Sequence, residues 1–163
     1  MPNWCSNYVS IRHDDAEKIK QMQSSIDEGN LFETFAPLGE WDYAKAVEVW
    51  GTKWDAHQAD VQNVTPDGKA IDLSFDTAWG PPTGFYDKLT EQGFSVDATY
   101  HEPGMCFAGH YTSENGDDSY EYDFSNENWR DDISDEDVLM LLEGEYECYL
   151  EYPEDEEDDK EEE

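Results

Sequence analysis

The sequence predicts an α+β protein in which strands and helices are interleaved along one domain. Its length of 163 residues is typical of a single domain. Hydrophobic residues make up 37% of the chain and aromatic residues 14%, which suffices for a packed core and argues against a disordered chain. Short segments of alternating apolar and polar residues indicate strands, and segments with apolar residues at helical spacing indicate helices.

The first elements predicted are a strand and a helix. Residues 4–12 mix aromatic, aliphatic and small polar side chains as a strand does. Asp14-Asp-Ala-Glu17 has the spacing of a capping box, which marks the start of a helix. Apolar residues continue at helical spacing from Ile19 to Gly29, where this helix is expected to end. We expect residues 31–51 to be irregular.

A hairpin is predicted after this irregular stretch. Two strands, residues 54–64 and 70–78, are joined by Thr65-Pro-Asp-Gly68, which is typical of a tight turn. The second strand alternates between apolar and polar residues, as a half-buried strand does. Its apolar residues are Ile71, Leu73 and Phe75, and its polar residues are Asp72, Ser74 and Asp76.

A second helix and two more strands follow the hairpin. The helix is expected from Pro81 to about Gln92, with Gly93 as its stop. Residues 94–100 and 106–112 are predicted to be strands. Up to residue 100 the order is strand–helix–strand–strand–helix–strand, which is that of the ferredoxin-like split βαβ core.

Additional antiparallel strands and a short late helix are predicted beyond this core. Asn115-Gly116 is typical of a hairpin tip, and residues 120–124 alternate as a strand. Ser134 is expected to cap a short helix that ends at Gly144. Residues 145–152 alternate again and predict a last strand.

The domain organisation follows from these elements. We expect a single ferredoxin-like α+β domain over residues 1–152, with an acidic C-terminal extension from about residue 114. Residues 153–163 are almost purely acidic and are expected to form a disordered tail. Such a tail can steer association, but we do not count it as a binding face.

Several unusual short sequences occur in an order that resembles the YubB ferredoxin-like family. They are Asn3-Trp-Cys-Ser-Asn7, Trp50-Gly-Thr-Lys-Trp-Asp55, Phe75-Asp-Thr-Ala-Trp-Gly-Pro-Pro82, Tyr100-His-Glu-Pro-Gly104 and Phe107-Ala-Gly109. Members of this family are phage and plasmid proteins, largely of unknown function. The resemblance covers roughly residues 3–112 and implies a ferredoxin-like core and a mobile-element origin. It implies no activity, and the acidic part after residue 113 lies mostly outside it.

Charge is the dominant feature of the composition. The chain holds 42 acidic and 9 basic residues, for a net charge of −33. A net charge of about 2–8 in magnitude is usual for a small domain. Because self-repulsion destabilises a compact chain, some benefit must offset it. Adaptation to high salt and recognition of a cationic partner are two such benefits.

The uneven distribution of this charge favours a cationic partner. Residues 1–113 hold 18 of the 42 acidic and 7 of the 9 basic residues, a net of −11. Residues 114–163 hold the other 24 acidic and 2 basic residues, a net of −22. A protein adapted to high salt is expected to be acidic over its whole surface. Concentration of the charge in the last third therefore indicates a directed interaction face.

Composition also excludes several classes of protein. Nine basic residues cannot neutralise phosphates beside 42 acids, so direct nucleic-acid binding is not expected. No signal peptide and no membrane-spanning segment is expected from the sequence. Cys5, Cys106 and Cys148 are too few and too scattered for a disulfide framework and fit a reducing compartment. We therefore expect a soluble, cytoplasmic protein, in the host cell cytoplasm if a phage encodes it.

No catalytic residue, cofactor or metal is expected. His13, His57, His101 and His110 do not have the spacing of known zinc sites. The acids near residue 117 lack the pattern of a calcium-binding loop. The sequence leaves the oligomeric state open.

The main hypothesis is an acidic DNA mimic. Alternate side chains of a strand share one face, so Glu121 with Asp123, and Glu145 with Glu147, are expected to form rows of carboxylates. Such a face can occupy a groove built for DNA and satisfy its Lys and Arg residues. The hypothesis is a phage or plasmid anti-defence protein that blocks a host restriction, CRISPR or recombination nuclease. The predicted partner-binding residues are Glu121, Asp123, Asp131, Asp132, Asp135, Glu136, Glu145 and Glu147.

Two alternatives remain open at this point. One is a small enzyme or ligand-binding domain that uses Trp50–Asp55 and Trp79, because a lysine beside an aspartate and indole rings can hold an anionic ligand. Tryptophan and lysine in such a setting more often serve as core and as surface charge. The other alternative is an acidic factor that sequesters a basic protein.

Overall fold

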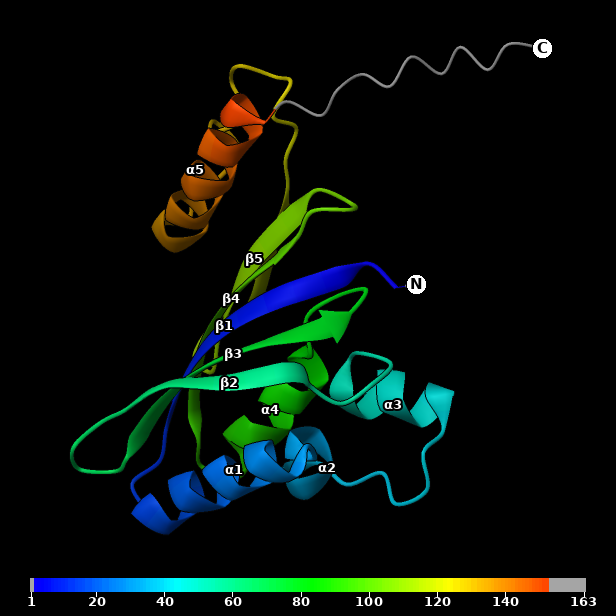
Figure 1. Cartoon of the computed structure of the whole chain (residues 1–163), viewed down its shortest axis with the longest axis vertical. Coiled ribbons are helices and arrows are strands. Elements are labelled where there is room, and N and C mark those ends of the chain that lie inside the picture. The colour runs from blue at the N-terminus through cyan, green and yellow to red at the C-terminus, as the bar shows by residue number, and fades with distance from the viewer. Residues whose placement is uncertain (1, 153–163) are drawn as a thin grey trace.

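The structure, a computed structural model, describes residues 2–152 and contains one six-stranded antiparallel sheet (Figure 1). Neighbouring strands follow the order β2-β3-β1-β4-β5-β6. The strands are β1 (Trp4–Arg12), β2 (His57–Val64), β3 (Ala70–Ala78), β4 (Ser95–Glu102), β5 (Phe107–Thr112) and β6 (Gly116–Glu121). The helices are α1 (Ala16–Glu28), α2 (Leu31–Phe35), α3 (Tyr43–Trp50), α4 (Thr83–Glu91) and α5 (Glu136–Glu151).

The predicted α+β class and ferredoxin-like core are confirmed. The elements β1, α1, β2, β3, α4 and β4 occur in the split βαβ order, with β1 and β3 paired at the centre of these four strands. The additional antiparallel strands β5 and β6 extend the sheet beyond β4. Figure 1 shows α1 to α4 together on one side of the sheet and α5 apart from them, beyond β5.

The main core lies between the sheet and the helices α1 to α4. Alternation sends Val9 and Ile11 of β1 into this layer, where α1 contributes Ile19 and Met22. Each such side chain stabilises the fold by roughly 1.5–3 kcal/mol when fully buried. Phe32 of α2 is central, since its ring centroid lies 5.6 Å from that of Trp50, 5.6 Å from Phe75 and 4.3 Å from Phe85.

A second, smaller core lies between α5 and the strands β5 and β6. It combines side chains of the strands, of the segment between β6 and α5, and of α5 itself. Its buried members are Ala108, Tyr122, Trp129, Ile133, Val138 and Leu142, and Tyr120, Phe124, Leu139 and Tyr146 pack against them. The acidic third of the chain is therefore tied to the sheet by aromatic and aliphatic packing.

The first helix agrees with its sequence signals. Asp15 caps α1 by accepting a hydrogen bond from the backbone N–H of Glu17 at 3.0 Å. Gly29 ends the helix with a φ of 75°, a left-handed conformation that glycine adopts without strain. The predicted second helix is also confirmed, as α4.

The prediction that residues 31–51 are irregular is wrong, because this stretch contains α2 and α3. The carboxylate of Asp55 accepts hydrogen bonds from the backbone N–H groups of Phe32 at 2.8 Å and Glu33 at 3.0 Å, which caps α2 from a distant part of the chain. Asp42 caps α3 by accepting from the backbone N–H of Lys45. A five-residue helix capped over such a separation leaves no local pattern.

The predicted last strand over residues 145–152 is wrong, because these residues continue α5. The helix runs for 16 residues through Gly144, so it is not short, and its N-cap is Asp135 rather than Ser134. Val138, Leu142 and Tyr146 are four residues apart, lie on one face of the helix and pack into the second core. Over so short a segment the sequence fits both the alternation of a strand and the spacing of a helix, and this packing favours the helix.

Two smaller differences concern segment ends. The strand expected over residues 120–124 is found as β6, which ends at Glu121, so Asp123 lies outside it. The strand expected from residue 54 begins at His57.

The predicted disordered tail, residues 153–163, lies outside the described residues. Among residues 2–152, no helix has the length and apolar character needed to cross a bilayer.

Substitution of Gly84 tests the close packing of α3 against α4. A Cβ atom at Gly84 would lie 2.5 Å from the carbonyl oxygen of Val49 and 3.0 Å from the carbonyl carbon of Trp50. We expect Gly84→Ala to lower the free energy of unfolding by about 1–3 kcal/mol, because the two helices must separate. The measurement is urea unfolding followed by circular dichroism.

Gly144→Ala is the matched control, since a Cβ atom at Gly144 meets nothing within 4 Å. Alanine inside α5 should raise stability by roughly 0.5–1 kcal/mol. Equal stability of Gly84→Ala and the wild-type protein would contradict the α3–α4 contact.

Candidate functional site

The face of the sheet opposite α1 and α4 is polar. Alternation along β1 places Ser6, Tyr8 and Ser10 on this open face, while Val9 and Ile11 point into the core. The pairing register brings polar residues of the neighbouring strands beside them: Asp72, Ser74 and Asp76 of β3, and Asp97 and Thr99 of β4. The predicted alternation of residues 71–76 is thus confirmed.

Carboxylates dominate the charge of this open face. Ser10 of β1 is paired with both Asp72 and Asp97, so these two acids lie two strands apart, which is about 10 Å. Asp72 and Asp76 lie four residues apart along β3, which is about 13 Å. Asp60 of β2 adds a fourth carboxylate opposite Ser74.

These carboxylates have little cationic compensation. Arg12, at the end of β1, is the one Lys or Arg residue within the six strands that the structure describes. Over residues 2–152, the Lys and Arg ion pairs join other acids: Glu17, Glu91 and Glu143. Asp72 accepts a hydrogen bond from the Ser10 hydroxyl at 2.7 Å, and Asp60 accepts one from the Gln62 amide at 2.9 Å. The charges of Asp60, Asp72 and Asp76 therefore remain available to a cationic partner, whereas Asp97 is hydrogen-bonded to His110.

A groove lies between this open face and the N-terminal half of α5. It has a volume of about 470 Å³ and is lined by Tyr8, Ser10, Asp72, Asp97, Asp137 and Met140, among others. A polar hollow of about 300 Å³ adjoins it at Tyr8 and includes Asp60 and Asp76. The groove thus combines carboxylates with the exposed apolar surface of Tyr8 and Met140, which are 47% and 72% exposed.

Tyr8 stays protonated in this setting. Partial burial, together with the negative charges of Glu145 and Asp76, raises the pKa of its hydroxyl above the usual value of 10.0. At neutral pH it can donate a hydrogen bond from the centre of the open face. It is the aromatic residue that a bound partner would meet among the carboxylates.

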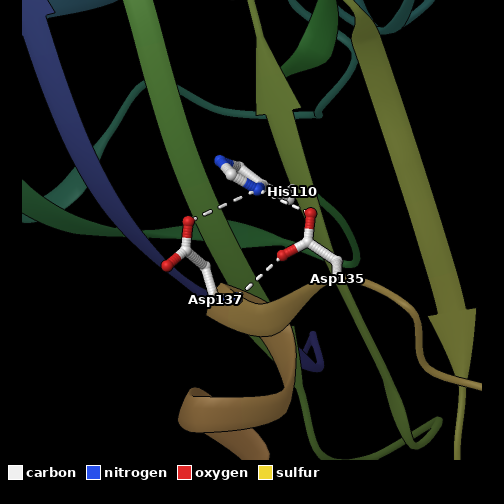
Figure 2. Close-up of side chains that lie close together, drawn as sticks. All are labelled: His110, Asp135 and Asp137. Carbon is white, nitrogen blue, oxygen red and sulfur yellow. Dashed lines mark hydrogen bonds and ion pairs between the residues drawn. The ribbon is translucent and has the colours of Figure 1, made fainter.

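A histidine held between carboxylates joins α5 to the sheet (Figure 2). His110 of β5 has its Nε2 atom 2.6 Å from Oδ1 of Asp97 and its Nδ1 atom 2.8 Å from Oδ2 of Asp135. Asp137 follows at 3.8 Å from Nδ1. Burial alone would lower the pKa of His110, but the hydrogen bonds and charges of Asp97 and Asp135 outweigh it and raise the pKa above 6.5. The imidazolium form, which donates from both nitrogens, satisfies both carboxylates at once.

His110, Asp135 and Asp137 are also the described residues that could hold a metal ion, because one ligand atom of each lies within 4.8 Å of the others. Imidazole and carboxylate ligands suit divalent transition metals. However, Asp135 also caps α5, as its Oδ1 accepts from the N–H groups of Asp137 and Val138. The hydrogen-bonded contacts of this cluster explain its geometry as a joint between α5 and the sheet.

The structure distributes the predicted partner-binding residues over several elements. Three of them make internal contacts: Asp135 at the α5 cap, Asp123 with the hydroxyl and N–H of Ser125, and Glu145 near His101. Five others are exposed: Glu121 at the end of β6, Asp131 and Asp132 before α5, and Glu136 and Glu147 on α5.

The expected rows of carboxylates do not form as strand faces. Glu145 and Glu147 lie in α5, where two residues span about 200° around the axis, so they point to different sides. Asp123 lies beyond the end of β6, so it does not share a strand face with Glu121.

The alternative site at Trp50–Asp55 consists largely of structural residues. Trp50 is buried, and its indole N–H donates to the carbonyl of Ala36 at 2.8 Å. The Asp55 carboxylate caps α2, and burial raises its pKa although three backbone N–H groups stabilise its charge. Lys53 lies 4.4 Å from the ring centroid of Trp54, and Trp79 is 54% exposed.

The acids of the open face, Asp60, Asp72, Asp76 and Asp97, were not among the predicted partner-binding residues. The alternation of residues 71–76 places Asp72 and Asp76 on one face in the sequence itself. That Asp97 and Asp60 share this face depends on strand order and register, which the sequence does not display.

The fold and this polar face define an α+β protein of the ferredoxin-like class. The chain belongs to the family described as the ferredoxin-like domain in Api92-like protein, whose model matches residues 49–162. The match includes the acidic region after residue 113, which the YubB resemblance places mostly outside. That region is therefore part of the family domain.

A solved structure is also similar to this chain. It is the crystal structure of the protein Api92 from Yersinia pseudotuberculosis, which is 20% identical, with a TM-score of 0.38. The similarity covers 50% of this chain and 30% of that chain, so this chain spans less than a third of the length of Api92. A search of curated proteins found no match.

The His110 cluster predicts a specific pH dependence of stability. Because the pKa of His110 is raised in the folded protein, its stabilising contribution is complete below about pH 6.5 and is lost as the pH rises through the folded-state pKa. We expect His110→Gln to destabilise the protein by roughly 1–2 kcal/mol at pH 5.5 and by less at pH 9. Urea unfolding of both proteins at the two pH values measures this. An equal difference at both would show that His110 is not charged in the folded state.

Proposed function

We propose that this protein binds a cationic surface of another protein with the open face of its sheet and the adjoining side of α5. By occupying that surface it keeps nucleic acid away, and in this sense it acts as an acidic DNA mimic. The observation that carries this proposal is the group of open-face carboxylates, Asp60, Asp72 and Asp76, that have no Lys, Arg or His ion pair within residues 2–152.

A solubility role alone explains this face less well. Soluble surfaces ordinarily intersperse both signs of charge. Here four acids face outward from three strands, whereas the strands contribute Arg12 alone as a Lys or Arg residue. Their backbone positions are held by the sheet, so binding orders less of the chain than it would in a flexible acidic segment.

The remaining acids have a separate role in the proposal. The exposed residues Glu121, Asp131, Asp132, Glu136 and Glu147, at the end of β6, before α5 and on α5, would act as rim charges. Rim charges accelerate encounter with an oppositely charged partner more than they strengthen the final complex. With a net charge of −33, association should be fast and should weaken as salt screens the charges.

The class of partner that we propose is a DNA-binding enzyme of a host defence system. The resemblance to the YubB family suggests a phage or plasmid origin, and a DNA mimic in that setting serves as an anti-defence inhibitor. The partner would be a host restriction, CRISPR or recombination nuclease, bound in the cytoplasm without chemistry, cofactor or direct contact with nucleic acid. An acidic factor that sequesters a basic protein shares these electrostatics, and competition with DNA separates the two.

The decisive experiment is capture of bacterial proteins by the tagged chain at 50 and 300 mM salt, with and without duplex DNA. We expect a DNA-binding protein to be retained at low salt and displaced by the duplex. A triple variant, Asp60→Asn, Asp72→Asn and Asp76→Asn, should bind that protein at least about tenfold more weakly.

The matched control removes the same charge from exposed positions on α1 and α3, in the opposite layer: Asp27→Asn, Glu28→Gln and Glu48→Gln. It should bind as the wild type does. Equal binding by both triple variants would exclude the open face as the site. A partner that duplex DNA does not displace would argue against mimicry.

A further inference from the structure

A second cavity lies at the C-terminal half of α5. It has a volume of about 690 Å³ and is bounded by the β4–β5 turn, the segment after β6 and the last turns of α5. Its walls include His101, Tyr122, Phe124, Glu145 and Tyr149, with Tyr152 also contributing. This volume is within the range of pockets that bind small molecules or single side chains.

Aromatic rings form much of the wall. The ring centroids of Tyr122 and Phe124 are 4.4 Å apart, and those of Phe124 and Tyr149 are 5.6 Å apart. Tyr122 and Phe124 also belong to the second core, which holds them in place. The faces of such rings attract cations and planar delocalised groups.

The carboxylate of Glu145 faces the same cavity. The Oε1 atom of Glu145 lies 4.0 Å from Nδ1 of His101, whose other ring nitrogen is hydrogen-bonded to the Tyr122 hydroxyl. Burial lowers the pKa of His101 below 6.5 although the charges of Glu145 and Glu102 oppose this, so at neutral pH the imidazole does not neutralise Glu145. Asp123 adds a second acid at the wall.

Arg130 of this chain lies in a comparable environment of aromatic rings and a carboxylate. Arg130 stacks on Trp129, with its guanidinium carbon 4.4 Å from the ring centroid, and on Tyr146 at 5.0 Å. Its guanidinium is bound by both carboxylate oxygens of Glu143, and Nη2 lies 2.8 Å from Oε2. A guanidinium between aromatic faces and a carboxylate of α5 is thus already present beside the cavity. An ammonium group lacks the planar shape that this arrangement uses.

We propose that this cavity binds the guanidinium group of an arginine side chain from the partner, stacked on the aromatic wall and paired with Glu145. The identity of the protein that supplies the arginine rests on the proposed function. The affinity of the pocket for a guanidinium group does not depend on it. An arginine buried in an aromatic pocket is a typical hot spot of a protein interface. The open face would then supply attraction over a broad area and the pocket a single anchoring contact.

The test uses a defined probe, N-acetyl-arginine amide, titrated into the isotope-labelled full chain and followed by NMR. N-acetyl-citrulline amide, which has nearly the same shape without the charge, is the comparison ligand. We expect the arginine probe to bind with a dissociation constant of about 1–10 mM and to shift the signals of His101, Phe124 and Tyr149. The citrulline probe should bind at least about tenfold more weakly.

Two variants make the test specific. Glu145→Gln should weaken binding of the arginine probe by about tenfold, because the charge-assisted hydrogen bonds are lost. Glu48→Gln removes the same charge from an exposed position on α3, in the opposite layer, and should leave binding unchanged. Equal effects of the two variants, or equal binding of citrulline and arginine, would overturn the pocket assignment.

The outcome is separable from that of the proposed function. The triple variant of Asp60, Asp72 and Asp76 leaves the pocket intact, so it should still bind the arginine probe. If this triple variant loses the captured partner but the probe shifts no signal near Glu145, the pocket inference fails and the proposed function stands. If the probe binds but no duplex-sensitive partner is captured, the proposed function fails and the pocket remains a guanidinium site.

Discussion

The pairing of β1 with both β3 and β4 is the constraint on which the rest of the structure depends. Because side chains alternate along a strand, this register sends Val9 and Ile11 into the main core and leaves Ser10 opposite Asp72 and Asp97. Slippage by one residue would bury the carboxylates and expose the core. The hydrophobic core therefore also determines the spacing of the acids on the open face.

The acidic third of the chain is compatible with folding because it brings its own apolar surface. Self-repulsion of 24 acidic residues opposes a compact arrangement. The second core and the hydrogen bonds of His110 to Asp97 and Asp135 offset this repulsion and hold α5 beside the sheet. The packing of α5 against the sheet forms both the acidic groove and the aromatic pocket. The stability of the acidic third and the formation of both cavities therefore depend on the same contact.

Together these features describe a surface that combines long-range attraction with local selectivity. In the proposed function, carboxylates on the sheet would attract a cationic surface, and in the further inference the aromatic pocket with Glu145 would select a guanidinium. Interfaces in general use charge for encounter and a few buried anchors for affinity. The family match over residues 49–162 includes both the acids of the open face and the residues of the aromatic pocket.

The sequence by itself determined the α+β class, the split βαβ order, α1, α4 and the outward alternation of Asp72 and Asp76, because these depend on local periodicity, caps and turns. Tertiary structure decided the rest. Asp55 induces α2 through a cap from 22 residues away, and packing of Leu142 and Tyr146 makes residues 145–151 helical where alternation suggested a strand. The convergence of Asp60, Asp72 and Asp97 on one face, and of Glu145 on an aromatic pocket, arises from strand order and helix docking, which are long-range contacts that no local pattern encodes.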